Sequence, residues 1–154
     1  MKVITLLENT ARKETLCRAH GLSLYLETPA HKILCDMGPN AGFLENAQAL
    51  ADFFNRTHPD RIVNFSLFLH RRAPLYQDIL SGQFTPADEV ENLREEHRLL
   101  ELLETPGLSY DGFHDCISVR IRGLLPQDRE KMLRKLEEAI GTYEKKDPVF
   151  AIVP

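Results

Sequence analysis

The chain has 154 residues, enough for one domain with a sizeable core, and its formal charge of −4 comes from 23 acidic and 19 basic residues. A weakly acidic chain lacks the basic surface that binds nucleic acids or anionic membranes, so we expect neither as a partner. No apolar run approaches the roughly 20 residues that span a bilayer, and we expect no signal peptide. The three widely spaced cysteines are typical of reduced thiols in a cytoplasmic protein rather than of a disulfide framework.

Strands are predicted in the first third of the chain. The sequence LSLYLET alternates apolar and polar residues, and KILCD returns after a short turn, which together predict a β-hairpin. The sequence KVITLLE, rich in β-forming residues, predicts a strand before it. These three predicted strands cover residues 2–8, 22–28 and 32–36.

The middle of the chain predicts a helix and then a long strand. Apolar residues recur at helical spacing over residues 42–56, after a proline and an asparagine that favour a helix start. The sequence RIVNFSLFLH predicts a strand over 61–70. Asn64 and Ser66 are polar positions on one face of that strand, and we expect them to pair with backbone or with a neighbouring strand.

The second half predicts further helices and strands. The sequence TPGLSYDGFHD, residues 105–115, shows no clear period and predicts a loop. His97 falls on the apolar stripe of a predicted helix, where we expect a core histidine bonded to backbone or to a carboxylate. The remaining predicted elements are a short helix over 76–80, a helix over 88–104, a strand over 116–123, a helix over 126–145 and an edge strand within 147–154.

These elements predict a mixed α/β fold class, with a small sheet that includes an N-terminal β-hairpin and with three main helices. We expect residues 1–154 to form a single compact domain, with helices on at least one face of one sheet.

The N-terminal segments resemble the start of a metallo-β-lactamase-fold hydrolase, of the subgroup similar to dihydropterin-phosphate synthase-type enzymes. The resemblance covers residues 1–47 and places Asp36 at the family's Asp-x-Gly turn. The segments that carry it are VITLLENT (3–10), HGLSLYLET (20–28) and HKILCDMGPNAGFLENA (31–47).

This resemblance implies a metal motif that the chain does not complete. In the family the next strand ends in His-x-His-x-Asp-His, whose side chains hold two metal ions. His70 stands where the first ligand would fall, but Arg72, Pro74 and Leu75 occupy the other three positions. The resemblance therefore implies a local fold and not the family's activity, and we expect Asp36 to accept hydrogen bonds from the backbone of its turn.

The rest of the chain, residues 48–154, resembles the C-terminal end of radical S-adenosylmethionine enzymes. The shared features are a strand followed by PLY…G-x-FTP, an acidic helix, and a tail helix with G-x-LP-x-D and ML-x-x-L. The family's Cys-x3-Cys-x2-Cys, whose thiolates hold the iron–sulfur cluster, is missing. The two resemblances meet near residues 46–51, inside the predicted helix, where we expect Leu50 to be buried.

Three functional hypotheses follow. The first is a remnant or chimera without a complete active site, at most a small-molecule-binding or interaction domain of the radical S-adenosylmethionine-enzyme C-terminal type, with no cofactor. The alternative is a metallo-β-lactamase-fold metal-dependent hydrolase with an unorthodox zinc site. The third is an accessory fragment that docks on a protein partner carrying the cluster. Candidate metal ligands for the alternative are Asp36, His70, His114 and Cys116.

The sequence GFHDC, residues 112–116, is the densest chemical cluster. On an extended segment His114 and Cys116 would point to the same side, and with His97 or Cys35 they would form a zinc site. The interpretation that we prefer is a loop histidine without metal beside a buried, slowly reacting thiol. Similarly, His70 with the two arginines that follow it predicts either a phosphate site or a solvated basic turn, and we prefer the second.

Overall fold

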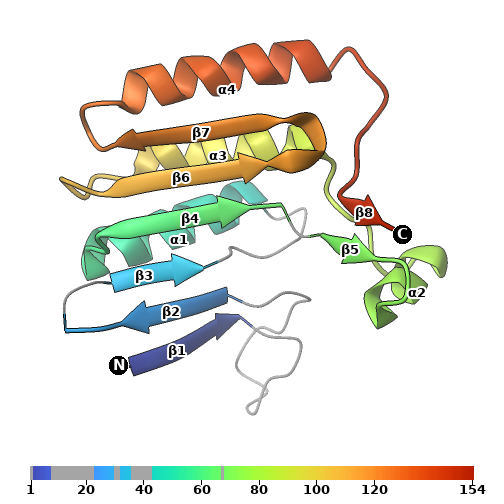
Figure 1. Ribbon diagram of the computed structural model, residues 1–154, viewed down its shortest axis with the longest axis horizontal. Helices are drawn as coiled ribbons and strands as arrows, with labels where there is room; N and C mark the ends of the chain where they lie inside the picture. Colours follow the sequence, from blue (N-terminus) through green and yellow to red (C-terminus); the bar gives the residue numbers. More distant parts are fainter. Residues whose placement is uncertain (1, 8–22, 30–31, 36–42, 67) are drawn as a thin grey trace.

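The computed structural model describes residues 2–7, 23–29, 32–35, 43–66 and 68–154, and this part of the chain combines four α-helices with two β-sheets (Figure 1). The predicted mixed α/β class, with an N-terminal hairpin and three main helices, is confirmed. The strands are β1 (Lys2–Leu7), β2 (Ser23–Glu27), β3 (Lys32–Cys35), β4 (Arg61–Phe65), β5 (Leu69–His70), β6 (Ser109–His114), β7 (Val119–Leu124) and β8 (Ile152–Val153). The helices are α1 (Phe43–Thr57), α2 (Pro74–Leu80), α3 (Glu89–Leu102) and α4 (Arg129–Tyr143), and Asp115–Ile117 forms a short 3₁₀ turn, η1.

The larger sheet is mixed. Its strand order is β1-β2-β3-β4-β6-β7, while β5 and β8 pair in a separate two-stranded sheet. Strand β2 runs antiparallel to its neighbours β1 and β3, strands β3, β4 and β6 run parallel, and β7 returns antiparallel to β6. Because β4 and β6 are parallel, their carboxyl ends lie at one edge of the sheet, which brings Ser66 and His114 together.

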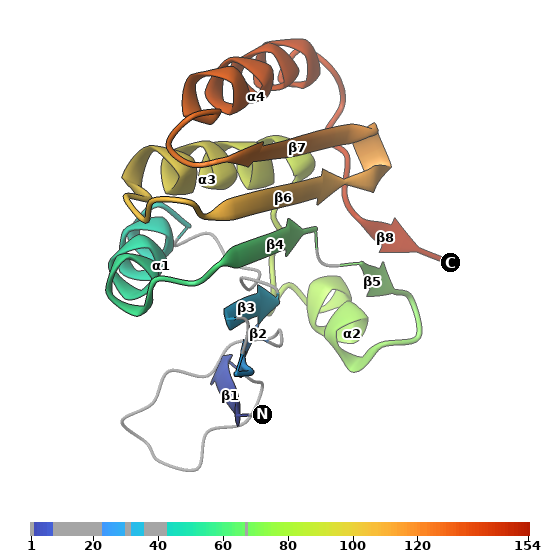
Figure 2. The same cartoon turned by 60° about the vertical axis from the view of Figure 1, so that its left-hand side comes forward.

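Helices cover one face of this sheet. In Figure 1 α1 and α3 lie behind the central strands, α4 lies beside α3 and β7, and Figure 2 again shows α3 behind β6 and β7. Their apolar stripes pack on β4, β6 and β7 to form the core. Its fully buried side chains are Phe54, Ile62, Leu93, Leu99, Leu100, Leu103, Leu108, Tyr110, Ile121, Leu125 and Leu136. No helix of the described ranges is both long and apolar enough to cross a membrane.

Helix α1 runs unbroken across residues 46–51, where the two family resemblances meet. Ala47, Ala51 and Phe54 are fully buried in the core. Leu50, which we expected to be buried, is half-buried and packs against the edge of that core. The helix therefore contributes core side chains from both sides of the meeting point, and the single domain over 1–154 stays a prediction.

A capping box fixes the start of α3. The Asp88 carboxylate accepts the backbone N–H of Glu91 at 2.8 Å, and the Glu91 carboxylate accepts the backbone N–H of Asp88 at 2.9 Å. Glu89 therefore stands in the first turn of the helix.

The predicted strand over 61–70 is wrong beyond its middle. Strand β4 ends at Phe65, and the backbone N–H of Ser66 makes a last, 3.4 Å bond to the carbonyl of Phe113. Leu69 then pairs in parallel with Ile152 in the second sheet. Both sides of the break are buried, with Ser66 directly after the end of β4 and Leu69 at the start of β5 in the second sheet.

The predicted loop over 105–115 is wrong from Ser109 to His114, because these residues form β6 between β4 and β7. The residues of β6 that face the helices are Tyr110, Gly112 and His114. The sequence therefore lacks the alternation of aliphatic and polar residues that predicts a strand. The next three residues form η1, and β7 begins at Val119 rather than at 116.

Candidate functional site

A closed polar cluster lies between α3 and the carboxyl ends of β4 and β6. We call Ser66, Glu89, Glu96 and His114 the His114 cluster; all four are at most 5% exposed. Glu89 and Glu96 stand two helical turns apart on one face of α3, and His114 ends β6. The elements thus bring together four polar side chains that are far apart in the sequence.

The imidazole of His114 is held at both nitrogens. Its Nδ1 lies 3.0 Å from Glu89 Oε2, and its Nε2 lies 2.7 Å from Glu96 Oε2. Burial lowers the pKa of His114, but hydrogen bonds and the negative charge from both glutamates outweigh burial and raise it to about 9. At neutral pH His114 is therefore an imidazolium that donates to both carboxylates.

Strand β6 is shaped to receive Glu96. A Cβ added at Gly112 would collide with the Glu96 carboxylate, so glycine makes room for it. Two residues before Gly112 on β6, the Tyr110 hydroxyl accepts a 3.2 Å hydrogen bond from Asn64 Nδ2. Burial and the charge of Glu96 raise the pKa of Tyr110 well above its usual value, so this hydroxyl stays neutral. The predicted pairing of Asn64 with a neighbouring strand is confirmed.

The cluster has more acceptors than donors. Oε1 of Glu89 and Oε1 of Glu96 are buried and lack a well-aligned hydrogen bond within the described ranges, although the Tyr110 hydroxyl interacts with the Glu96 side chain. A buried acceptor without a partner is costly, and buried carboxylates depend on the cation that pairs with them. The local balance of charge therefore rests on His114.

A hydroxyl, an imidazole and a carboxylate stand in line here, the residue types of a hydrolytic triad. The Ser66 Oγ lies 3.3 Å from His114 Nδ1 but donates to Glu89 Oε2 at 2.9 Å. An imidazolium has no lone pair with which to take the serine proton, and the group is closed to solvent. What this arrangement can do is clamp α3 to the sheet.

The face of the sheet opposite the helices carries a second polar group. We call the outward side chains of β4, β6 and β7 the open sheet face, because no described helix lies in front of these strands in Figure 1. The strand register arranges them in rows. These rows are Phe65–Phe113–Arg120, Val63–Asp111–Arg122 and Arg61–Ser109–Leu124.

Asp111 gathers two arginines on this face. Arg120 donates from Nε and Nη2 at 3.2 and 3.3 Å, and Arg122 donates from Nε and Nη2 at 3.0 and 2.5 Å. The arginines cover Asp111, which is 5% exposed, while their own side chains are 49% and 62% exposed. Burial would raise the pKa of Asp111, but the bonds from Arg122 and Arg120 lower it below its usual value.

Apolar groups border these charges. The Arg120 guanidinium lies 3.9 Å from the ring centre of Phe113, a cation–π contact. Phe65 and Leu124 are 40% and 41% exposed. The open sheet face therefore combines oriented guanidinium groups with exposed apolar side chains.

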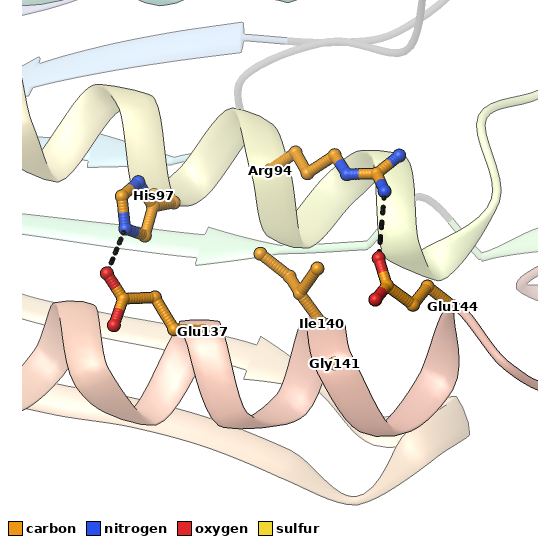
Figure 3. A pocket seen from close by; sticks show the side chains of 6 residues that line it. All are labelled: Arg94, His97, Glu137, Ile140, Gly141 and Glu144. Carbon is orange, nitrogen blue, oxygen red and sulfur yellow. Dashed lines mark hydrogen bonds and ion pairs between the residues drawn. The ribbon is translucent and has the colours of Figure 1, made fainter.

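A groove of about 360 Å³ lies between α3 and α4 (Figure 3). Figure 3 shows polar side chains paired across the two helices. Arg94 lies 3.3 Å from Glu144, and His97 lies 3.4 Å from Glu137. The expected carboxylate partner of His97 is confirmed, but the side chain is half-buried at the rim rather than in the core. Because these charges already pair, the groove is a solvated seam between helices.

Three of the candidate zinc ligands, His70, His114 and Cys116, lie in the described ranges, where they form no group that could hold a metal ion. His70 is exposed, and its Nδ1 accepts the backbone N–H of Arg72 at 2.9 Å. His114 is buried in its cluster, and Asp36 lies outside the described residues. Over the described ranges, no three or more His, Cys, Asp or Glu residues lie together so that they could hold a metal ion.

The expected burial of Cys116 is wrong. The residue is exposed, because η1 turns it outward and buries Ile117 instead. Partial burial of the thiol and the negative charges of Glu89 and Asp115 nevertheless raise its pKa. Slow reaction of this thiol stays a prediction.

Sequence reasoning missed Glu89, Glu96 and Asp111. A signal for the first two existed: they occupy positions of the apolar stripe that also contains Leu93 and Leu100. Acidic residues on a buried stripe need a cationic partner, which pointed to a histidine elsewhere. Asp111 gives no comparable signal, because the sequence around it predicts a loop.

No protein-family model, no curated protein and no solved structure matches this chain. The resemblances to metallo-β-lactamase-fold hydrolases and to radical S-adenosylmethionine enzymes therefore stay predictions. What can be said of function rests on the two polar groups, one sealed beneath α3 and one on the open sheet face.

Proposed function

We propose that this chain is a non-catalytic interaction domain that binds a protein partner through the open sheet face. In the terms of the resemblance over residues 48–154, it is a binding domain of the radical S-adenosylmethionine-enzyme C-terminal type without the cluster. The observation that carries the proposal is the exposure of Phe65 and Leu124 around the Asp111-bound arginines Arg120 and Arg122.

The composition of this face supports a protein partner. Aromatic residues and arginine are enriched where proteins bind each other, because they combine a large contact area with few flexible bonds or with many donors. A sheet face with exposed apolar groups gains free energy when a partner removes them from water. The His114 cluster has the residue types for catalysis but is closed to substrate, which favours binding over chemistry.

The test begins with a pair of matched variants. Phe65→Ser with Leu124→Ser removes the exposed apolar groups of the face, and Leu80→Ser removes one of similar kind, 65% exposed, on α2. Both sets change surface side chains, so both should keep the circular dichroism spectrum and unfold within a few degrees of the wild type.

Wild type and variants are immobilised, proteins retained from a lysate are identified, and each retained protein is purified and titrated against all three forms by calorimetry. We expect one purified protein to bind wild type and Leu80→Ser alike and to bind the double variant at least about tenfold more weakly, the scale of an interface hot spot. Equal binding to the double variant, or no purified protein that binds the wild type, overturns the proposal.

A further inference from the structure

One strand of the open sheet face presents a short linear pattern. Arg120, Arg122 and Leu124 stand at alternate positions of β7, so their side chains leave the same face. Successive members of this row are about 6.6–6.8 Å apart, the distance spanned by two residues of a strand. A second extended chain has the same repeat, so its alternate residues can meet the row one to one.

Asp111 orients the guanidinium groups of Arg120 and Arg122 but leaves some of their N–H donors free. Their four hydrogen bonds to this carboxylate use Nε and Nη2 of each guanidinium, and no described residue bonds either Nη1. One carboxylate against two guanidinium groups leaves a net positive charge, to which Arg61 on the same face adds. Because Asp111 and the Phe113 ring hold the arginines, a ligand would order little side-chain freedom on binding.

From this pattern we propose that the partner binds through an extended acidic segment of the form Glu-x-Glu-x-apolar, with its carboxylates on Arg120 and Arg122 and its apolar residue on Leu124. This inference rests on the proposed function and adds the chemistry of the partner. Carboxylates complement arginine in charge and shape, because one guanidinium group can bind one carboxylate through two parallel hydrogen bonds. With one residue between them, the two glutamates lie on the same side of an extended chain.

The surroundings favour a short acidic segment over a long polyanion. The whole chain carries a formal charge of −4, which repels a uniformly charged polymer such as a nucleic acid. The positive charge of Arg120 and Arg122 on this face is bordered by the exposed apolar side chains of Phe65 and Leu124. A peptide with both acidic and apolar residues complements the arginines and the apolar side chains of this face.

The experiment compares two labelled peptides of equal composition by fluorescence anisotropy. The first is Ser-Glu-Thr-Glu-Thr-Leu-Ser, and the second is Ser-Thr-Glu-Glu-Thr-Leu-Ser, in which adjacent glutamates point to opposite sides of an extended chain. A heparin fragment is the polyanion probe. The protein variant is Asp111→Asn with Arg120→Gln and Arg122→Gln, which removes the ion pairs without leaving Asp111 unpaired.

The matched control is Arg98→Gln with Glu101→Gln, which removes an exposed ion pair of α3. We expect the first peptide to bind wild type and control at least about fivefold more tightly than the second, with salt weakening the binding and with loss of the preference in the triple variant. Equal binding of the two peptides, binding unchanged in the triple variant, or tighter binding of heparin than of either peptide overturns the inference. If the purified partner still depends on Phe65 and Leu124, only the acidic motif fails and the proposed function stands.

Discussion

Replacing His114 with glutamine removes the cation that holds two buried glutamates. The pKa of His114 rises from 6.5 to about 9 on folding, which corresponds to about 3 kcal/mol at roughly 1.4 kcal/mol per pH unit. Because the folded pKa lies above the unfolded one, this contribution is complete below about pH 6.5 and is lost as pH rises through about 9. Glutamine can donate to one carboxylate but carries no charge at any pH.

Urea unfolding followed by circular dichroism measures the effect. Near pH 6 we expect His114→Gln to lower the free energy of unfolding by about 3 kcal/mol, with an unchanged dependence on urea concentration. Above about pH 9.5 the difference between wild type and variant should largely disappear, since neutral imidazole and glutamine then both lack charge. The wild-type protein should itself lose stability between about pH 6 and pH 9.5. This measurement tests the reasoning even if the variant does not fold.

His97→Gln is the control, because His97 faces Glu101 and Glu137 at the surface, where such pairs contribute less than about 1 kcal/mol. The reasoning is refuted if wild-type stability does not fall between about pH 6.5 and 9, or if the difference between wild type and His114→Gln is the same at both ends of the range.

Three further expectations concern packing, reactivity and cooperativity. Gly112→Ala should lower the free energy of unfolding by about 1–3 kcal/mol, because its Cβ meets the Glu96 carboxylate. Gly141→Ala, in open space on α4, should instead raise it by up to about 1 kcal/mol. Equal thermal stability of the two variants would contradict the close contact between Gly112 and Glu96. Cys116 should react with iodoacetamide at neutral pH more slowly than free glutathione, since partial burial and two acidic neighbours raise its pKa. Faster reaction, seen by peptide mass spectrometry, would contradict this. Phe54→Ala should cost about 3–5 kcal/mol and keep one unfolding transition by circular dichroism and by tyrosine fluorescence, whereas two transitions would disprove the single domain.

The helices were predictable because each buries one apolar stripe. The predicted helix over 42–56 corresponds to α1, the helix over 88–104 to α3 and the helix over 126–145 to α4, each within a few residues at its ends. The hairpin was predictable for a similar reason, since alternation and a short turn are local features. Such signals lie within a dozen residues of one another and need no knowledge of the rest of the fold.

Strand β6 was not predictable from its own residues. Its inward positions are Tyr110, Gly112 and His114, and its outward positions include Asp111. The partners that make this composition tolerable are distant in sequence: Glu89 and Glu96 lie on α3. When the polar side chains of a strand find their hydrogen-bond partners only on a distant element, the sequence of the strand alone predicts a loop.

The same dependence suggests why charge is retained beneath α3. Burying an ion pair often adds little stability over an apolar alternative, but it can fix how elements fit together. Glu89 and Glu96 both reach one imidazole, and the Glu96 carboxylate fills the space that Gly112 leaves on β6. Sliding α3 by one turn would separate His114 from at least one glutamate and leave its charge buried alone. The His114 cluster therefore fixes the position of α3 against one face of the sheet, and this positioning role explains why charge is kept in a buried place.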